Sequence, residues 1–143
     1  MTDPGFSGGP LDVATLEVMA RRAVGHRLVS AWAFQSDAMS PRRLQLRLDA
    51  TQYPEPVRAA KLDARWFEDG DYSIHYLERR DDGTWQCHWD RHPKPGTEPV
   101  HFHPSPSASG DVDPSEIDAN PHLGILFEVL DRIEERVTTL YEK

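Results

Sequence analysis

Apolar and polar residues alternate along much of the first two thirds of the chain. The alternation is strict at residues 44–48 and 62–66 and looser at residues 28–36. Two further alternating runs lie within residues 72–92, on either side of an Asp-Gly pair. A period of two is typical of strands that bury one face. The pattern therefore predicts five sequential strands joined by short turns, which is an antiparallel meander.

Two segments have the helical period instead. Asp12 is a suitable N-cap for a first helix that ends near Gly25. Asn120 and Pro121 suit the cap and first position of a second helix. Its apolar positions, three or four residues apart, are Leu123, Leu126, Leu130, Ile133, Val137 and Leu140. The predicted fold is α+β, with an about five-stranded, mostly antiparallel meander sheet and both helices packed on one face.

The length of 143 residues suits one domain. We expect residues 1–10 to form a flexible leader and residues 11–143 a single α+β domain, with an irregular proline-rich segment at 93–121. No apolar run is long enough to span a membrane, and the leader lacks the features of a secretory signal. The single cysteine, Cys87, excludes an internal disulfide and fits a reducing cytoplasm, where it is expected to be a core residue.

The net charge of −8 is unevenly distributed along the chain. Basic residues are in excess in segment 21–62, whereas acidic residues dominate segment 110–143. Lysine is scarce relative to arginine. An acidic composition that is poor in lysine resembles that of proteins from salt-accumulating halophiles. In molar salt the Debye length is only about 3 Å, so the net charge would hardly steer a partner. The acidic total therefore does not exclude a nucleic-acid partner.

Five of the seven histidines lie between residues 75 and 103. A two-residue turn at Asp82-Gly83 predicts that His75 lies directly opposite Asp90. Side chains alternate faces along a strand, so one face of this hairpin should be polar and the other aromatic. The polar face is expected to carry His75, His88, Asp90 and His92. A turn at Asp81-Asp82 would keep the same two faces, because the register moves by an even step.

General acid-base chemistry is the leading interpretation of this polar face. Metal-independent RNA cleavage needs a base for the 2′-hydroxyl, an acid for the leaving 5′-oxygen and a cation near the phosphate. Histidine suits both proton roles, and Asp90 could orient the His75 imidazole. The candidate catalytic residues are His75, His88, Asp90, His92, His101 and His103. The candidate phosphate-binding residues are Arg79, Arg91 and Lys94.

Two alternatives to catalysis remain open. The histidines could be hydrogen-bonded strand residues without a chemical role. His88, Asp90, His101 and His103 could instead bind a metal ion, although their spacing matches no zinc signature. We therefore expect no metal or other cofactor. The competing class is a non-catalytic module that binds a metal or a partner through the same face.

Three segments resemble the TumE-like family of small toxins from toxin-antitoxin pairs. They are residues 70–76, 85–93 and 101–104, and the resemblance extends over residues 66–140. It implies a growth-inhibiting RNase, encoded beside a helix-turn-helix antitoxin, and a halophilic archaeal branch fits the composition. The positions that match the family motifs are His75, Asp90, His92, His101 and His103. Residues 1–60 match loosely. The expected partners are the antitoxin and RNA, with a second copy of the chain as a further candidate and no membrane.

Overall fold

Each strand of the sheet pairs antiparallel with the strand that precedes it in the chain. The computed structural model describes residues 10–37, 40–91, 100–103, 113–114 and 122–142. Within these residues seven strands form one sheet in the order β1 to β7. They are β1 (Val29–Asp37), β2 (Ser40–Leu48), β3 (Val57–Trp66), β4 (Tyr72–Arg80), β5 (Gly83–Arg91), β6 (Val100–His103) and β7 (Asp113–Pro114). The five long strands confirm the predicted antiparallel meander.

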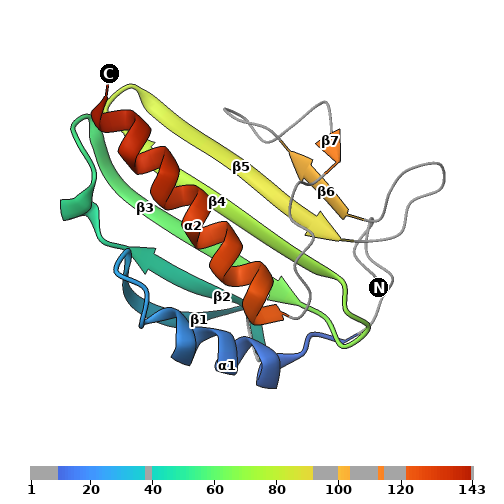
Figure 1. The fold of residues 1–143 in the computed structure, drawn as a ribbon. Coiled ribbons are helices and arrows are strands. Elements are labelled where there is room, and N and C mark those ends of the chain that lie inside the picture. Colours follow the sequence, from blue (N-terminus) through green and yellow to red (C-terminus); the bar gives the residue numbers. More distant parts are fainter. Residues whose placement is uncertain (1–9, 38–39, 92–99, 104–112, 115–121, 143) are drawn as a thin grey trace.

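The two helices lie on the same face of the sheet, as predicted. Helix α1 (Val13–Ala23) begins where the Asp12 carboxylate accepts a hydrogen bond from the Thr15 backbone N–H at 3.0 Å. It packs against β2, β3 and helix α2 (His122–Tyr141), which runs diagonally over the middle strands (Figure 1). The proposed cap of α2 at residues 120–121 lies outside the described residues. Neither helix has the length and apolar composition that a membrane span requires.

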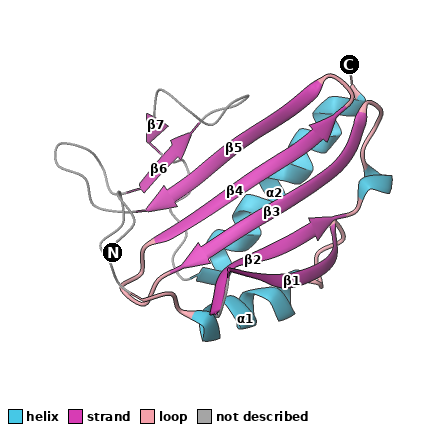
Figure 2. Cartoon of the chain, turned by 180° about the vertical axis from the view of Figure 1, so that it is seen from behind, coloured by secondary structure: helices cyan, strands magenta, loops and turns pink. Residues whose placement is uncertain are grey.

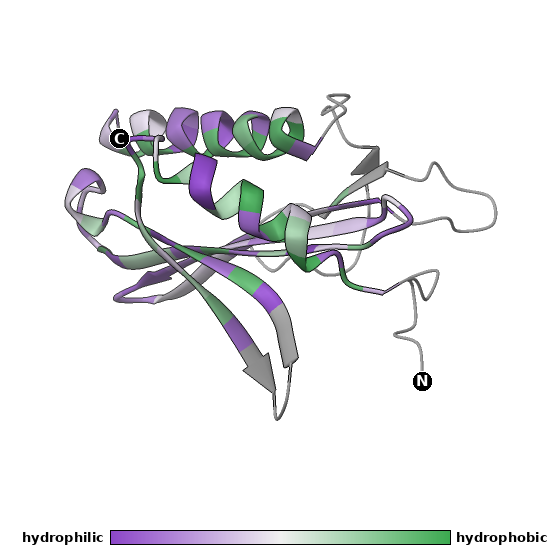
Figure 3. Ribbon diagram, turned by 90° about the horizontal axis from the view of Figure 1, so that it is seen from below, coloured by the Kyte–Doolittle hydropathy of each residue, from purple (hydrophilic) through white to green (hydrophobic). Residues whose placement is uncertain are grey.

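The core lies between the helices and the inner face of the sheet. Leu44, Leu46 and Leu48 in β2 are at most 2% exposed, so the strict alternation in this strand marks burial. Apolar residues of α2 face the sheet from across this core (Figure 3). Cys87 belongs to the same core, and its burial raises the pKa of the thiol to about 12. Cys87 is therefore a core residue and not a reactive thiolate.

The proline-rich segment is less irregular than predicted. Strands β6 and β7 both lie within residues 93–121, and β6 extends the sheet beyond the edge of β5. The backbone of β6 forms its hydrogen bonds with β5. The composition of the segment does not reveal this pairing. The rest of this segment, and residues 1–9 of the proposed leader, lie outside the described residues.

The β4–β5 hairpin turns one residue earlier than Asp82-Gly83. Arg80 pairs with Gly83, so Asp81 and Asp82 are the two turn residues. The direct pairing of His75 with Asp90 is therefore wrong: His75 pairs with His88, and Asp90 pairs with Ser73. The Asp81 carboxylate accepts hydrogen bonds from the Arg58 guanidinium at 2.6 and 3.1 Å. This contact joins the turn to β3, and the register shift of two keeps every residue on its predicted face.

Candidate active site

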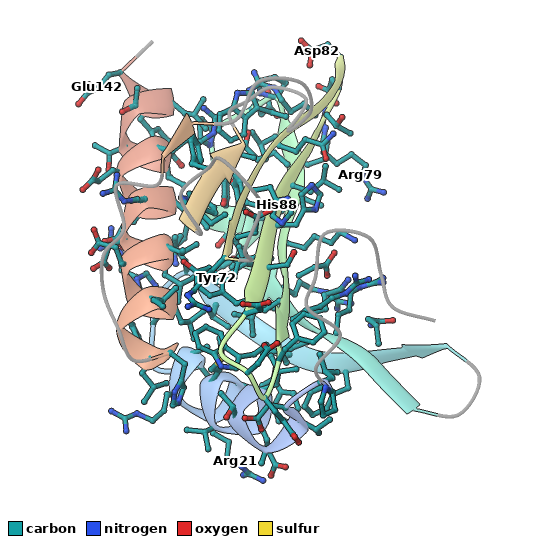
Figure 4. The ribbon with its side chains drawn as sticks, turned by 90° about the vertical axis from the view of Figure 1, so that its right-hand side faces the viewer. Arg21, Tyr72, Arg79, Asp82, His88 and Glu142 are labelled. Carbon is teal, nitrogen blue, oxygen red and sulfur yellow. The ribbon has the colours of Figure 1, made fainter. Side chains whose placement is uncertain are left out.

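The sheet has one face that no described helix covers (Figure 2). We call it the open face. It carries the alternate residues of β2 to β5 whose neighbours are buried in the core, such as Ser73, His75 and Leu77 in β4. Figure 4 shows Arg79 and His88 on the side of the sheet that faces away from α2. The polar face predicted for the hairpin is thus the open face of the whole sheet.

A row of polar residues crosses the open face at right angles to the strands. Gln45 pairs with Asp63, Asp63 with His75, and His75 with His88. His88 in turn pairs with His103 of β6, so three histidines occupy one register row on three adjacent strands. Directly paired residues are the closest side-chain neighbours in a sheet. The register therefore places the backbone positions of His75, His88 and His103 in one row.

The imidazoles of His75 and His88 meet edge to face. Their ring centroids are 6.0 Å apart and the ring planes are inclined by 89°. His75 Nε2 lies 2.7 Å from the Gln86 side-chain oxygen. Because that oxygen only accepts hydrogen bonds, Nε2 carries the proton and Nδ1 is left with a lone pair. His88 Nε2 lies 2.6 Å from the Ser73 hydroxyl, which can either donate or accept.

Asp90 is buried beside His88. It is 3% exposed, and one of its carboxylate oxygens is 4.0 Å from His88 Nε2. The expected role of Asp90 as the orienting partner of His75 is not supported, because Gln86 has that position. Burial raises the pKa of Tyr72 to about 12, and the negative charge of Asp90 adds to the shift. Asp90 thus places a carboxylate next to the second imidazole of the pair.

The remaining predicted site residues are placed less completely. His101 and His103 are in β6, where the backbone pairs them with Asp90 and His88. His92 and Lys94 lie outside the described residues. Arg79 is exposed on the open face. Arg91 instead donates a hydrogen bond at 2.9 Å to the buried carboxylate of Asp71, so its guanidinium has a structural partner.

Three residues of the site escape the motif-based prediction. Gln86 and Ser73 bond to the two imidazoles, and Asp63 is the register partner of His75 on β3. Ser73 and Gln86 lie within the family-like segments 70–76 and 85–93 but are not among the positions carried over from the family, and Asp63 lies outside those segments. The alternation of β3 could have identified Asp63, because polar residues there separate buried Leu62, Ala64 and Trp66. Gln86 could not be found without the register.

Cations outnumber carboxylates on the open face. At its described positions in β2 to β5 the cationic residues are Arg43, Arg47, Lys61, Arg65 and Arg79. The carboxylates at those positions are Asp63 and Asp90. On the opposite side of the sheet, α2 carries four carboxylates and two arginines. A molecule with a net charge of −8 therefore concentrates positive charge around its histidines.

One group of candidate metal ligands exists among the described residues, and it lies away from the open face. It consists of His26, Asp131 and Glu134, with His26 Nε2 3.3 Å from a carboxylate oxygen of Asp131. His26 Nδ1 accepts a hydrogen bond from the Leu28 backbone N–H at 3.2 Å. The imidazole proton must then be on Nε2, where a metal would need a lone pair. The donor set therefore fits a hydrogen bond between His26 and α2 better than a metal ion.

A cavity of about 450 Å³ lies on the helix side, between α2 and β5. Trp85 and Trp89 contribute to its wall, and the Arg136 guanidinium lies 3.2 Å from the centroid of the Trp85 ring. Arg136 also donates two hydrogen bonds, of 2.6 and 2.9 Å, to the fully buried carboxylate of Glu78. The charge of Arg136 is thus already balanced by the protein.

The fold and the open face define a small α+β protein with a cationic, histidine-bearing sheet. The family model described as toxin TumE matches residues 16–137. The chain belongs to the TumE toxin family, which confirms the resemblance of its motifs. No curated protein and no solved structure matches the chain. The chemistry of the site must therefore be argued from its own residues.

Proposed function

We propose that the protein is the toxin of a toxin-antitoxin pair and cleaves RNA on the open face without a metal ion. The observation that carries the proposal is the pair of neighbouring imidazoles, His75 and His88, on an accessible cationic surface. Two histidines of this kind can supply a base and an acid at neutral pH. Family membership supports the toxin role, and a cognate antitoxin is the corresponding partner.

The environments of the two imidazoles favour different roles. Gln86 fixes the proton of His75 on Nε2, which leaves Nδ1 able to accept the proton of an RNA 2′-hydroxyl. The carboxylate of Asp90 stabilises the positive charge that His88 carries when it is protonated. We therefore assign His75 as the base and His88 as the acid.

The reaction needs no further reagent. The 2′-oxygen attacks the adjacent phosphorus while His75 takes the hydroxyl proton. The bond from phosphorus to the 5′-oxygen breaks, and His88 donates its proton to that leaving oxygen. The products are a 2′,3′-cyclic phosphate and a free 5′-hydroxyl. Exchange of protons with solvent then restores both imidazoles.

A second candidate function is a non-catalytic module that binds a partner through the open face. It is favoured by one observation: Nε2 of each imidazole already has a hydrogen-bond partner in the protein. In that case the imidazoles would only order the sheet surface. The two functions predict different results for glutamine substitutions. Glutamine cannot transfer protons as histidine does, but it is of similar size and still forms hydrogen bonds.

Growth arrest distinguishes them. Expression of the protein without an antitoxin should slow growth, and His75→Gln or His88→Gln should restore the growth rate of uninduced cells. His26→Gln is the matched control, because His26 bonds to α2 on the other side of the sheet. It should remain toxic. Full toxicity of both site variants at equal protein levels would remove the catalytic proposal.

A further inference from the structure

A second hollow lies on the open face beside the histidine row. It has a volume of about 530 Å³, and Leu77 and Ala59 belong to its lining. The cationic side chains that line it are Arg47, Arg58, Lys61 and Arg79. A hollow that combines apolar surface with several cations suits a ligand with one flat apolar part and one anionic part.

The hollow occupies the register row next to the histidines. Arg47 pairs with Lys61, and Lys61 pairs with Leu77. Leu77 pairs with Gln86, the residue that bonds to His75. Rows two residues apart along a strand are separated by about 7 Å. This is the scale of one nucleotide step in an extended strand.

Two of the cations are available to a ligand. Arg47 and Arg79 are exposed and form no ion pair with any residue that the structure describes. Lys61 lies 3.3 Å from a carboxylate oxygen of Asp63, and Arg58 is bonded to Asp81. Arg47 and Arg79 stand on different strands on either side of Lys61, so an anion between them would meet positive charge from both directions.

We propose that this hollow binds the nucleotide next to the scissile phosphate of a single-stranded RNA. Arg47 and Arg79 contact the phosphate, Lys61 adds positive charge, and Leu77 and Ala59 take the face of the base. The inference rests on the proposed function, because it places the RNA by its distance from the histidine row. Contacts of this kind carry affinity without sequence readout.

The test measures binding of an RNA that cannot be cleaved. A fluorescent 2′-O-methyl oligonucleotide has no free 2′-hydroxyl, so its affinity is independent of catalysis. Binding should weaken as sodium chloride rises, with a logarithmic slope of about 0.7 per phosphate contact on a single strand. In Arg47→Gln/Arg79→Gln the slope should fall by about 0.7, uniformly across oligonucleotide sequences, because both arginines contact the same phosphate.

The matched control removes the same charge from the helix side. Arg21 and Arg22 are exposed on α1, and Arg21→Gln/Arg22→Gln should leave the salt slope unchanged. An equal fall of the salt slope in both double variants would show an effect of net charge and would overturn the proposal. Binding of an acidic polypeptide, poly-glutamate, in preference to the RNA would overturn it as well. Unchanged melting temperatures confirm that both double variants are folded.

The inference and the proposed function fail separately. If the slope falls in the Arg47→Gln/Arg79→Gln variant as predicted but the wild-type protein does not cleave unmodified RNA, binding at the hollow is supported and the catalytic proposal is wrong. If unmodified RNA is cleaved and the double variant binds the oligonucleotide with an unchanged slope, the catalytic proposal is supported and the proposed binding at the hollow is wrong.

Discussion

At the scale of single residues, the carboxylate of Glu78 is held by several partners inside the protein. It is fully buried, bonded twice by Arg136, and it accepts a hydrogen bond of 2.6 Å from the Tyr76 hydroxyl. The Tyr53 hydroxyl lies 2.7 Å from that of Tyr76 and extends the network. Burial raises the pKa of both tyrosines, so both remain neutral donors. This network ties α2 to β4 beneath the open face.

Removal of one charge from the pair should destabilise the fold strongly. Arg136→Met leaves the Glu78 carboxylate buried without its main partner. The guanidinium of Arg80 is 3.8 Å from that carboxylate, which is too far for a hydrogen bond to replace the lost ones. We expect a loss of about 3 kcal/mol in the free energy of unfolding, measured by urea denaturation. Arg136→Met combined with Glu78→Gln should recover most of it, because no buried charge remains.

The control for this pair is exposed. Arg21 pairs with Glu17 on α1 with side chains 68% and 46% exposed, and Arg21→Met should cost at most about 1 kcal/mol. A loss in Arg136→Met no larger than in this control would contradict the account of the buried network.

At the scale of elements, the sequence predicted the two faces of the hairpin but not its register. Alternation assigns His75, His88 and Asp90 to one face whichever of the two turns forms, because the two registers differ by two residues. Which residues pair depends on the turn, and in the observed turn Asp81 is bonded to Arg58 of β3. Local sequence contains no information on that contact. The predicted face is therefore correct, whereas the predicted His75–Asp90 pair is wrong.

Whether the other features could be predicted depends in the same way on how local their contacts are. The helices were predictable because the Asp12 cap of α1 and the apolar spacing of both helices are local. The short strand β6 was not, since it forms only where β5 offers an edge. The partners of the imidazoles, Ser73 and Gln86, were missed because they depend on the cross-strand register.

Gly83 tests the observed turn. It has a φ of +135°, a conformation that other residues adopt only with strain, and an added Cβ would meet no atom within 4 Å. Gly83→Ala should therefore cost about 1 to 3 kcal/mol through backbone strain alone. Thr84→Ala, at the next and exposed position, should change stability by less than about 0.5 kcal/mol. Equal stability of the two variants would argue against the observed turn.

At the scale of the whole molecule, charge is divided between the two sides of the sheet. The helix side is acidic in α2, while the open face holds the histidines and an excess of cations. Composition alone gives an acidic protein, which argues against a nucleic-acid partner at ordinary salt. The fold adds what composition does not show: alternate residues of β2 and β3 place their arginines and lysine on one surface.

Product analysis decides whether the His75 and His88 imidazoles catalyse RNA cleavage, as we propose. Purified protein in excess EDTA should convert single-stranded RNA to fragments with 2′,3′-cyclic phosphate and 5′-hydroxyl ends. The rate should have a bell-shaped pH dependence, and His75→Gln or His88→Gln should lower it by about 10² to 10⁴-fold. His26→Gln should cleave at the wild-type rate. Absence of these ends with the wild-type protein, or unchanged cleavage by the His75 and His88 variants, would contradict the account.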